Sequence, residues 1–471
     1  MVFYLGSTVG VTLPRRIAYD CFVQVMYHGR RADTTLEQAY REFVELSRLD
    51  KNFIKEILYG SLRWYYKIYW ILNQTCKRDL EECDEYVKGA LICGAYQIYY
   101  MDRVPDRASV NESVEYVKEK GLSKASSFVN GILRQIARKS QYFPKPDKDE
   151  QFVEYLSVQY SHPAWMINRW LEQDELKKTT VERILTANNK QPSLFARVSP
   201  VSVDDVSRFQ NDLLKEEKTF SIKQSLPNCI RLKNSPMLGS GSLFSKGYYT
   251  IQNMSSQLVG HIASYTPSKL VIDGCAGPGG KLSYIYETHP DSDIIAIERS
   301  DSQYDRMIST MQRLGYDTPR VQFVKSDFLS YVPTEGRSPD KILLDAPCSG
   351  LGVLASHPEG RWHKTENIVG DLKQVQQKLI AHALDILSVG GELIFSVCSF
   401  EKEESLDHLS FIKDRFSDSV CFENIDERVP DYFKRYITDK QLLRIFPNEQ
   451  DEMDGFSCFV VKKVAETPNL S

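Results

Sequence analysis

Apolar residues in the first 140 positions recur at steps of three and four, the spacing of one buried face of an α-helix. One such stripe consists of Phe53, Ile54, Ile57, Leu58, Leu62, Tyr65 and Tyr69. Gly121 follows Lys118-Glu119-Lys120, which is typical of a helix that ends with basic residues in its last turn. Strand signals are absent from this region. The pattern therefore predicts an all-α domain over residues 1–140.

A linker and a less regular region follow the helical part. Residues 142–150, YFPKPDKDE, contain two prolines and clustered charges, a composition typical of a connector between domains. After a further helical stretch around Ser161-His162-Pro163, short β-like runs such as residues 194–198 alternate with polar turns. We expect a small α+β connector subdomain over residues 151–245.

From residue 268 onward, short apolar runs alternate with longer helical spans. The runs are LVID (270–273), DIIAIE (293–298), VQFVKSD (321–327), KILLD (341–345) and GELIFSVCS (391–399), and FSCFVVKKV (456–464) would add a last strand. This alternation is typical of an open α/β sheet of parallel strands. It predicts a Rossmann-like α/β domain over residues 246–464.

The composition is that of a globular chain with more than one domain. The 471 residues are 42% hydrophobic and 26% charged, and a chain of this length exceeds what one ordinary core supports. No apolar run reaches the length of about 18 residues that a transmembrane helix needs, so we expect no membrane span. The first apolar residues precede the first charges, unlike a secretory signal. A cytoplasmic location is the expectation.

The cysteine spacing and the distribution of charge indicate which ligands and partners the chain could bind. The ten cysteines include no CxxC pair, which favours reduced thiols over a disulfide framework or a zinc site, and we expect no metal. The net charge is −4, yet residues 1–140 hold 21 Lys and Arg against 17 Asp and Glu, a local charge of +4. This mild basic bias permits RNA or DNA binding at the N-terminal end without requiring it.

A glycine-rich string follows the first strand of the α/β region. Residues 273–281, DGCAGPGGK, lead from that strand into a helix. Such a turn leaves backbone amides bare at the positive end of a helix. A plain tight turn or a dinucleotide loop would also fit a shorter glycine pattern, but the full string favours a pocket for an anionic or closely packed ligand.

Three carboxylates stand at the ends of later strands. Glu298, Asp327 and Asp345 each close an apolar run. In a doubly wound sheet these ends face one crevice, and an acid after the second strand commonly binds ribose hydroxyls. A single acid there would more often be a helix cap, but three in register beside the glycine turn indicate a nucleoside ligand.

Two cysteines occupy further strand ends. Cys348 follows the strand that ends at Asp345, and Cys398 ends the run 391–399. If these strands are neighbours, about 4.8 Å apart, both thiols and Asp345 can converge on one small site. A lone buried cysteine is usually inert packing, but two beside a nucleoside pocket favour a chemical role.

These strings resemble a known family. DGCAGPGGK, LLDAPCSGLG (343–352) and FSVCS (395–399) are similar to motifs of S-adenosylmethionine-dependent RNA cytosine-5 methyltransferases. Five strings in the helical region resemble the NusB-like domain of the bacterial RsmB/Sun branch: YGSLRW (59–64), GAYQ (94–97), VPD (104–106), VNE (110–112) and FVNGILR (128–134). Two later strings, SHP (161–163) and QNMSS (252–256), are also similar to that branch. The resemblance covers nearly the whole chain.

The resemblance implies a cofactor and a set of site residues. S-adenosylmethionine would be held by Cys275, Ala276, Gly277, Pro278, Gly279, Gly280, Lys281, Glu298, Asp327 and Asp345. In this arrangement Glu298 would contact the ribose, Asp327 the adenine side, and Asp345 the active-site face. Cys398 would be the nucleophile, Cys348 would assist release of the product, and Asp345 would stabilise charge on the base.

The expected reaction is methyl transfer to C5 of a cytosine in structured RNA, with 16S ribosomal RNA as the expected target, through a covalent bond between Cys398 and C6. The partner is therefore RNA. A possible RNA-facing patch consists of Arg15, Arg16, Arg63, Arg134, Arg138 and Lys139. For each of them a solvated helix face is nearly as good an interpretation.

Some positions depart from the family pattern. Ala355-Ser356 stand where relatives usually carry basic residues, and Arg361 is a candidate to replace a missing RNA phosphate or active-site contact. Val397 stands where threonine is commoner, beside Cys398. Residues 454–458, DGFSC, keep only part of a late motif. None of these changes removes a residue that the mechanism needs. They therefore affect which substrate we expect, and not whether the reaction can occur.

Two alternatives remain open. A DNA cytosine-5 methyltransferase would use Cys348, within Pro347-Cys348, as its nucleophile, but this leaves Cys398 and the helical domain without a purpose. A non-catalytic RNA-binding or ribosome-assembly factor would account for the helical domain alone. It predicts an eroded pocket, whereas the glycine turn, the three acids and both cysteines are present.

Overall fold

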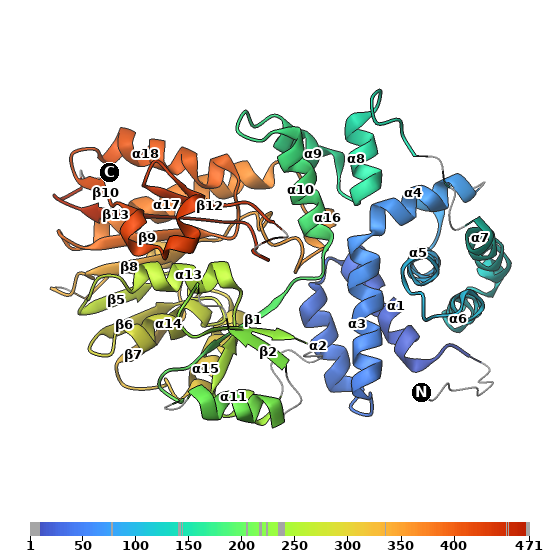
Figure 1. The fold of residues 1–471 in the computed structure, drawn as a ribbon, viewed down its shortest axis with the longest axis horizontal. Coiled ribbons are helices and arrows are strands. Elements are labelled where there is room, and N and C mark those ends of the chain that lie inside the picture. The colour runs from blue at the N-terminus through green and yellow to red at the C-terminus, as the bar shows by residue number, and fades with distance from the viewer. Residues whose placement is uncertain are drawn as a thin grey trace. The chain divides into compact units, whose positions relative to one another are not determined.

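The computed structural model describes residues 10–76, 79–139, 143, 145–203, 206–215, 219–222, 225–233, 241–334, 336–448, 450 and 452–467. The chain forms two compact units, which Figure 1 shows with their elements labelled. The helical unit comprises Met1–Gln191 and Leu354–Glu366, and the sheet unit comprises Pro192–Val353 and Asn367–Ser471. Part of the predicted linker, at 142 and 144, lies outside the described residues, and the predicted domain boundaries stay predictions.

The helical unit has no strand in its described residues, as the periodicity predicts. Its α-helices are α1 (Leu13–His28), α2 (Ala32–Glu42), α3 (Arg48–Arg63), α4 (Tyr65–Thr75), α5 (Glu85–Tyr100), α6 (Asp106–Glu119), α7 (Ser126–Lys139), α8 (Phe152–Tyr160), α9 (Ala164–Leu171), α10 (Lys178–Asn189) and α16 (Gly360–His363). Helix α5 packs against α1, α3, α6 and α7. A Cβ atom at Gly60 would overlap the ring of Tyr96, so this glycine permits α3 and α5 to approach closely.

The predicted apolar stripe is divided between two helices. Ile54, Ile57, Leu58 and Leu62 are completely buried in α3, as the spacing predicts. Helix α3 ends at Arg63 and α4 begins at Tyr65. Trp64, between them, stacks its ring on Tyr100 with centroids 4.9 Å apart. The apolar spacing in the sequence does not reveal this break, because apolar residues occupy the positions on both sides of it.

The large sheet of the sheet unit is mixed. Its order is β11-β12-β13-β9-β8-β5-β6-β7, and β10 also pairs with β13. The strands are β5 (Leu270–Asp273), β6 (Asp293–Ile297), β7 (Val321–Val324), β8 (Lys341–Asp345), β9 (Glu392–Val397), β10 (Val420–Phe422), β11 (Ile437–Thr438), β12 (Leu442–Ile445) and β13 (Phe456–Lys463). β5 to β9 run parallel, as predicted.

The prediction of an all-parallel sheet is wrong at one edge. β13 is antiparallel to β9, and β10, β11 and β12 add antiparallel pairs. The turn between β11 and β12 contains Asp439 and Lys440, both with positive φ. No glycine marks this turn, so the hairpin signal that usually reveals such strands is missing.

Helices cover both faces of the large sheet. Alternate strand residues such as Val271 and Leu343 pack in one core with α13 (Met254–Ala263), α14 (Gly280–Thr288) and α15 (Asp301–Leu314). Their neighbours Ile272 and Ile342 pack in a second core with α17 (Ile368–Ile386) and α18 (Leu406–Phe416). This arrangement confirms the Rossmann-like α/β prediction.

A second sheet confirms the small α+β connector. Its antiparallel strands β1 (Leu194–Val198), β2 (Thr219–Ile222), β3 (Cys229–Lys233) and β4 (Tyr249–Ile251) have the order β2-β3-β1-β4. Helices α11 (Val206–Lys215) and α12 (Ser242–Ser245) accompany them. Across all the described residues, no helix combines the length and the apolar character that crossing a membrane requires.

Candidate active site

Four neighbouring parallel strands place chemically reactive residues at one edge of the large sheet. Asp273 ends β5 and Asp345 ends β8, while Glu298 follows β6 and Cys398 follows β9. Because β6, β5, β8 and β9 are adjacent, these four residues share the edge at which open α/β sheets bind ligands. The strand ends alone therefore position the candidate site.

The turn between β5 and α14 is built around glycines. Gly277 and Gly279 have φ angles of 53° and 88°, a left-handed conformation that glycine adopts without strain. The N–H of Gly277 donates to Oε2 of Glu298 at 2.9 Å, and the N–H of Ser300 donates to Oε1 of Glu298 at 2.7 Å. Glu298 thus fixes the turn, and each oxygen keeps a lone pair for a ligand.

Asp273 is a site residue to which the sequence analysis gave no role. Its side chain has no exposed surface, and no side chain donates a hydrogen bond to its carboxylate, although a backbone contact with Cys275 lowers its pKa. Burial, together with the negative charge of Asp345, raises the pKa of Asp273 to about 7. A buried carboxylate to which no side chain donates is costly, so a positive charge nearby would stabilise its ionised form. The signal available in the sequence was its position as the first residue of DGCAGPGGK.

Asp345 is held at both of its carboxylate oxygens. The Nζ of Lys281 lies 2.6 Å from Oδ2, and the hydroxyl of Ser396 donates to Oδ1 at 2.9 Å. Lys281 also lies over the ring of Phe456, 5.4 Å from its centroid. Lys281 therefore contacts the active-site acid as well as belonging to the glycine-rich turn. Ser396 has no role in the sequence prediction, although it lies in β9 only two positions before Cys398.

The two cysteines lie in contact. The sulfur atoms of Cys348 and Cys398 are 3.1 Å apart, because β8 and β9 are paired with Asp345 opposite Ser396. The contact with Cys398 and burial raise the pKa of Cys348 well above its usual range. Cys348 therefore retains its proton. The structure thus brings both thiols and Asp345 to one place.

Close backbone contacts fix the segments that carry the cysteines. The N–H of Gly352 donates to the carbonyl of Cys398 at 3.2 Å, and the N–H of Gly455 donates to the carbonyl of Gly352 at 2.8 Å. A Cβ atom at Gly352 would overlap the carbonyl oxygen of Gly455. The residual late motif 454–458 therefore has a packing role beside the site.

Asp327 lies one strand further along the edge. It follows β7, accepts a hydrogen bond from the N–H of Leu329 at 2.9 Å, and lies 3.4 Å from the guanidinium of Arg299. Arg299 is the neighbour of Glu298 in the chain. Asp327 is thus at the β6 side of the glycine turn, away from the cysteines in the strand order.

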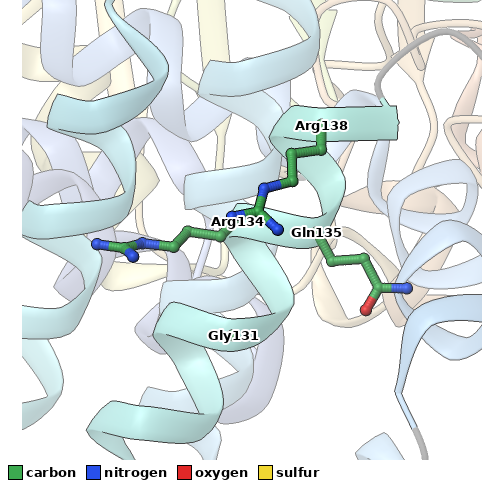
Figure 2. Close-up of a pocket in the computed structure, with 4 residues that line it drawn as sticks. All are labelled: Gly131, Arg134, Gln135 and Arg138. Atoms are coloured by element: carbon green, nitrogen blue, oxygen red, sulfur yellow. The ribbon is translucent and has the colours of Figure 1, made fainter.

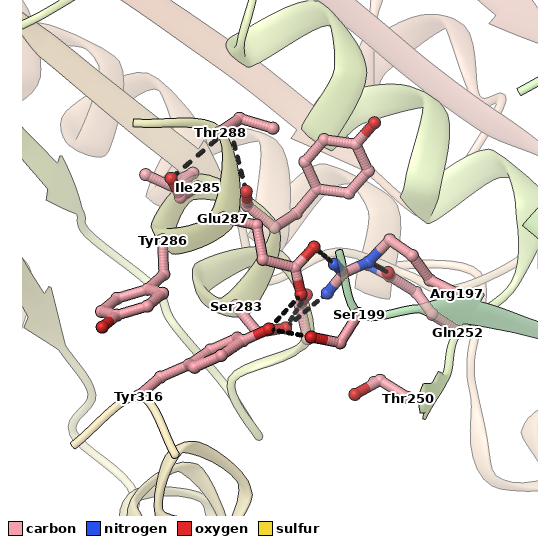
Figure 3. A network of polar contacts seen from close by, with 12 residues as sticks. Arg197, Ser199, Thr250, Gln252, Ser283, Ile285, Tyr286, Glu287, Thr288 and Tyr316 are labelled. Carbon is pink, nitrogen blue, oxygen red and sulfur yellow. Dashed lines mark hydrogen bonds and ion pairs between the residues drawn. The ribbon is translucent and has the colours of Figure 1, made fainter. Parts of the chain in front are cut away.

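A buried network ties the connector sheet to helix α14. Arg197 of β1 forms an ion pair with Glu287 and donates to the hydroxyl of Ser283 at 2.7 Å. The hydroxyl of Tyr316 donates to Glu287 at 2.8 Å and contacts Ser199. Figure 3 shows these side chains converging on the Glu287 carboxylate. Because α14 begins at the glycine-rich turn, the network also anchors that turn.

The predicted basic patch is divided by the structure. Arg15 and Arg63 are buried, so they do not form a surface, whereas Arg134 and Arg138 are exposed on α7. Arg16 is half-buried, and the side chain of Lys139 lies outside the described residues. The four residues Gly131, Arg134, Gln135 and Arg138 line an open cavity of about 360 Å³, shown in Figure 2.

Arg361 is not the replacement phosphate contact that the sequence suggested. Its side chain is completely buried. Its guanidinium donates to the carbonyls of Arg63, Ser161 and Asn188 at 3.0, 3.1 and 2.6 Å, and to the side-chain oxygen of Asn189 at 2.8 Å. A buried arginine that is engaged with carbonyls inside the helical unit cannot bind RNA phosphate.

Sequence models of three families match successive parts of the chain. The NusB family matches residues 12–138, the RsmF/B-like ferredoxin-like domain matches residues 162–237, and the 16S rRNA methyltransferase RsmB/F family matches residues 263–462. Within the described residues, no group of three or more His, Cys, Asp or Glu side chains could hold a metal ion.

Relatives and solved structures agree with these matches. A Synechocystis protein called probable ribosomal RNA small subunit methyltransferase B is 29% identical over 83% of this chain and 86% of its own length. The crystal structure of PH0851 superposes with a TM-score of 0.78, 18% identity, and coverage of 96% of this chain and 100% of its own. NSun6 from Pyrococcus horikoshii has a TM-score of 0.55 at 18% identity, covering 64% of this chain and 99% of its own. Residues 263–462 are thus similar to the RsmB/F family of 16S rRNA methyltransferases, and they follow parts of the chain that are similar to the NusB family and to the RsmF/B-like ferredoxin-like domain.

Proposed function

We propose that this protein transfers a methyl group from S-adenosylmethionine to C5 of a cytosine in 16S ribosomal RNA through a covalent bond between Cys398 and C6 of the base. The observation that carries the proposal is the pair of sulfur atoms 3.1 Å apart beside Asp345, at the carboxyl ends of β8 and β9. Two thiols and an acid form the set that addition to C6 and later release require.

S-adenosylmethionine fits the residues of the glycine-rich turn. The buried carboxylate of Asp273, to which no side chain donates a hydrogen bond, suits a ligand with ammonium and sulfonium cations. The turn 275–281 would pack against the cofactor, with Glu298 on the ribose and Asp327 on the adenine side. Supporting this, the NSun6 structure of similar fold contains SFG, an analogue of S-adenosylmethionine.

Attack on the base falls to Cys398 and Asp345. Position 5 of cytosine is a poor nucleophile, so the thiolate of Cys398 first adds to C6, and the displaced electron pair moves toward N3 and O2. Asp345, which contacts Lys281 and Ser396, would stabilise the negative charge that develops there by sharing a proton with N3.

Methyl transfer and release complete the reaction. When bound, S-adenosylmethionine supplies an electrophilic methyl group, which C5 attacks with the electron pair gained from the addition. A water molecule then takes up the C5 proton, the electron pair of the C5–H bond forms the C5–C6 double bond, and the C6–S bond breaks with its electron pair returning to Cys398. Cys348, whose sulfur touches that of Cys398, is the group placed to assist this release.

The RNA-binding surface that we propose is the exposed face of α7. Residues 126–139 contain no Asp or Glu, and Arg134 and Arg138 project from successive turns beside Gly131 (Figure 2). No side-chain atom stands over Gly131, so a phosphodiester backbone can approach closely. Arginine donors on such a face would contact phosphates. The target cytosine must then leave its stack to reach Cys398.

Adduct analysis with two variants tests the proposal. Cys398→Ala should abolish both methyl incorporation into 16S rRNA and covalent protein–RNA bands on a denaturing gel. Cys348→Ala should let the covalent band accumulate because release is impaired. The reverse pattern would exchange the two roles, and incorporation into duplex DNA but not RNA would favour the DNA alternative. A wild-type protein that fails to bind S-adenosylmethionine would favour a non-catalytic assembly factor.

A further inference from the structure

A buried carboxylate lies behind the Cys348 loop, and no step of the proposed reaction uses it. Glu404 ends the short helical turn Lys402–Glu404 and has no exposed surface. Its Oε1 accepts hydrogen bonds from the N–H of Ser349 at 2.8 Å and from the amide of Gln376 at 3.0 Å, and its Oε2 accepts from the hydroxyl of Ser349 at 2.5 Å. All three donors are neutral groups. Since a buried carboxylate is stable only when its oxygens are satisfied, these bonds hold Ser349 in place.

Gln376 binds the residue on the other side of Cys348, Pro347. Its amide nitrogen also donates to the carbonyl of Pro347 at 2.8 Å, and its oxygen contacts Nε2 of His408 at 2.7 Å. Burial lowers the pKa of His408 to about 4, so the ring is neutral and donates its Nε2 proton to Gln376. The amide can therefore take only one orientation. Pro347 and Ser349, the two neighbours of Cys348, are both fixed through Glu404 and Gln376.

The position of Cys348 beside Cys398 depends on this hold. The Cys398 segment has an anchor outside the Cys348 segment, because the carbonyl of Ser399 accepts from the hydroxyl of Ser457 at 2.8 Å. Two further contacts come from the Cys348 segment: the carbonyl of Cys398 accepts from the N–H of Gly352, and the hydroxyl of Ser349 contacts that of Ser399 at 3.3 Å. Cys348 lies three residues beyond the end of β8, outside the ladder that fixes the strands. The separation of the two sulfur atoms is thus set by the loop 347–349 and by the groups that bind it.

We propose that Glu404 is a positioning residue for Cys348, holding the loop 347–349 so that the sulfur of Cys348 stays against that of Cys398 during release of the methylated RNA. The inference rests on the proposed function, in which Cys348 assists release. It predicts that loss of Glu404 slows release far more than attack on the base, since the Cys398 segment keeps its bond from Ser457.

The test compares Glu404→Ala with Glu404→Gln, using 16S rRNA transcripts and radiolabelled S-adenosylmethionine. Glu404→Ala removes all three acceptors, and we expect the fraction of enzyme trapped as covalent RNA adduct to rise by about 10 to 100-fold. Methyl transfer in a single turnover should stay within about threefold of wild type. Glu404→Gln should restore release, because its amide oxygen can accept from both nitrogen donors while its NH₂ donates to Ser349. Glu403→Ala, in the same turn but less buried, is the matched control.

Each outcome bears on one claim. If Cys348→Ala accumulates adduct while Glu404→Ala releases RNA like wild type, the role of Glu404 is wrong and the proposed function stands. If Glu404→Ala lowers single-turnover transfer and the adduct together, with a lower unfolding temperature, Glu404 is merely structural and the inference is overturned. If Cys348→Ala itself gives no adduct, the proposed function fails first.

Discussion

Single residues at the sheet edge differ sharply in how their charges are satisfied. Asp345 has a cation and a hydroxyl at its two oxygens, and Glu298 has two backbone amides. Asp273 accepts no hydrogen bond from a side chain, and burial and the charge of Asp345 raise its pKa to about 7. The structure without cofactor therefore favours a proton on Asp273 near neutral pH. A cationic ligand would favour the ionised form, so binding and ionisation are coupled.

We predict that the affinity for S-adenosylmethionine rises with pH between about 5.5 and 7, by at most about tenfold per pH unit, because the ionised Asp273 binds the cation. In the absence of cofactor the sign is opposite for stability. The folded-state pKa is raised above the ordinary value of 3.8, so the free energy of unfolding should fall as pH rises from about 4 to about 7.

Calorimetric titration at pH 6 and pH 7 measures this coupling. Wild-type protein should release protons on binding, to an extent that buffers of different ionisation enthalpy reveal. Asp273→Asn should bind more weakly and with no pH dependence in this range, while Glu298 and Lys281, which face the same region, are unchanged. An affinity of the wild type that does not vary from pH 5.5 to 7 would contradict the role of Asp273.

Among the elements, helix α7 combines two exposed arginines, Arg134 and Arg138, with an open cavity on its surface. The double variant Arg134→Ala/Arg138→Ala should weaken binding to 16S rRNA transcripts by about 5 to 20-fold near 0.1 M salt, and should reduce the slope of log Kd against log salt by about 1 to 2. Two phosphate contacts are lost, so the effect should be similar for different RNA sequences.

Filter binding over a series of salt concentrations gives both quantities. Lys118→Ala is the matched control, since the ammonium of Lys118 is already paired with Glu115 at 2.7 Å. An unchanged salt slope in the double variant would remove α7 from the RNA-binding surface.

Helices and strands with one regular apolar pattern could be predicted from the sequence. Elements joined by a turn without glycine or proline could not. The runs that became β5 to β9 carry continuous apolar residues and were placed within three residues at each end. The hairpin of β11 and β12 was missed because Asp439 and Lys440 take positive φ without a glycine. The break between α3 and α4 was missed because Trp64 interrupts the helix without interrupting the apolar pattern.

At the scale of the whole molecule, one short segment of the second half of the chain folds with the first half. Leu354–Glu366 belongs to the helical unit. Beyond the bonds of Arg361, the indole N–H of Trp362 donates to the carbonyl of Leu62 at 2.7 Å, and Glu359 accepts from the N–H of Ala32 at 3.3 Å. This segment begins soon after the loop that carries Cys348. The helical unit is therefore complete only when residues far along the sequence join it.

We predict that Arg361→Met lowers the free energy of unfolding of the helical unit by about 3 kcal/mol, because the change leaves buried carbonyls of Arg63, Ser161 and Asn188 without a donor. All five tryptophans, Trp64, Trp70, Trp165, Trp170 and Trp362, belong to this unit. Tryptophan fluorescence during urea unfolding therefore follows the helical unit selectively. Arg134→Met, an exposed arginine of the same unit, should change its stability by less than about 0.5 kcal/mol, and an equal effect of the two changes would refute the anchoring role of Arg361.

In the candidate site, positions at strand ends could be predicted from the sequence, but contacts between distant segments could not. Strand-end positions predicted that Asp345, Cys348 and Cys398 would meet, because parallel neighbours end at one edge. The contact of Lys281 with Asp345, and that of Glu404 with Ser349, join segments about 60 residues apart in the sequence. Nothing in local spacing reports such contacts. Arg361 was misassigned for the same reason, since its surroundings come from α3, α8 and α10.

The central claim is that Cys398 attacks C6 of an RNA cytosine. The most direct measurement uses 16S rRNA transcripts made with 5-fluorocytidine, in which the C5–F bond prevents release after methyl transfer. Mass spectrometry of the digested complex then identifies the cysteine that carries the nucleotide. We expect the nucleotide on Cys398, and only when S-adenosylmethionine is present. Attachment to Cys348, or no attachment in the presence of cofactor, would contradict it.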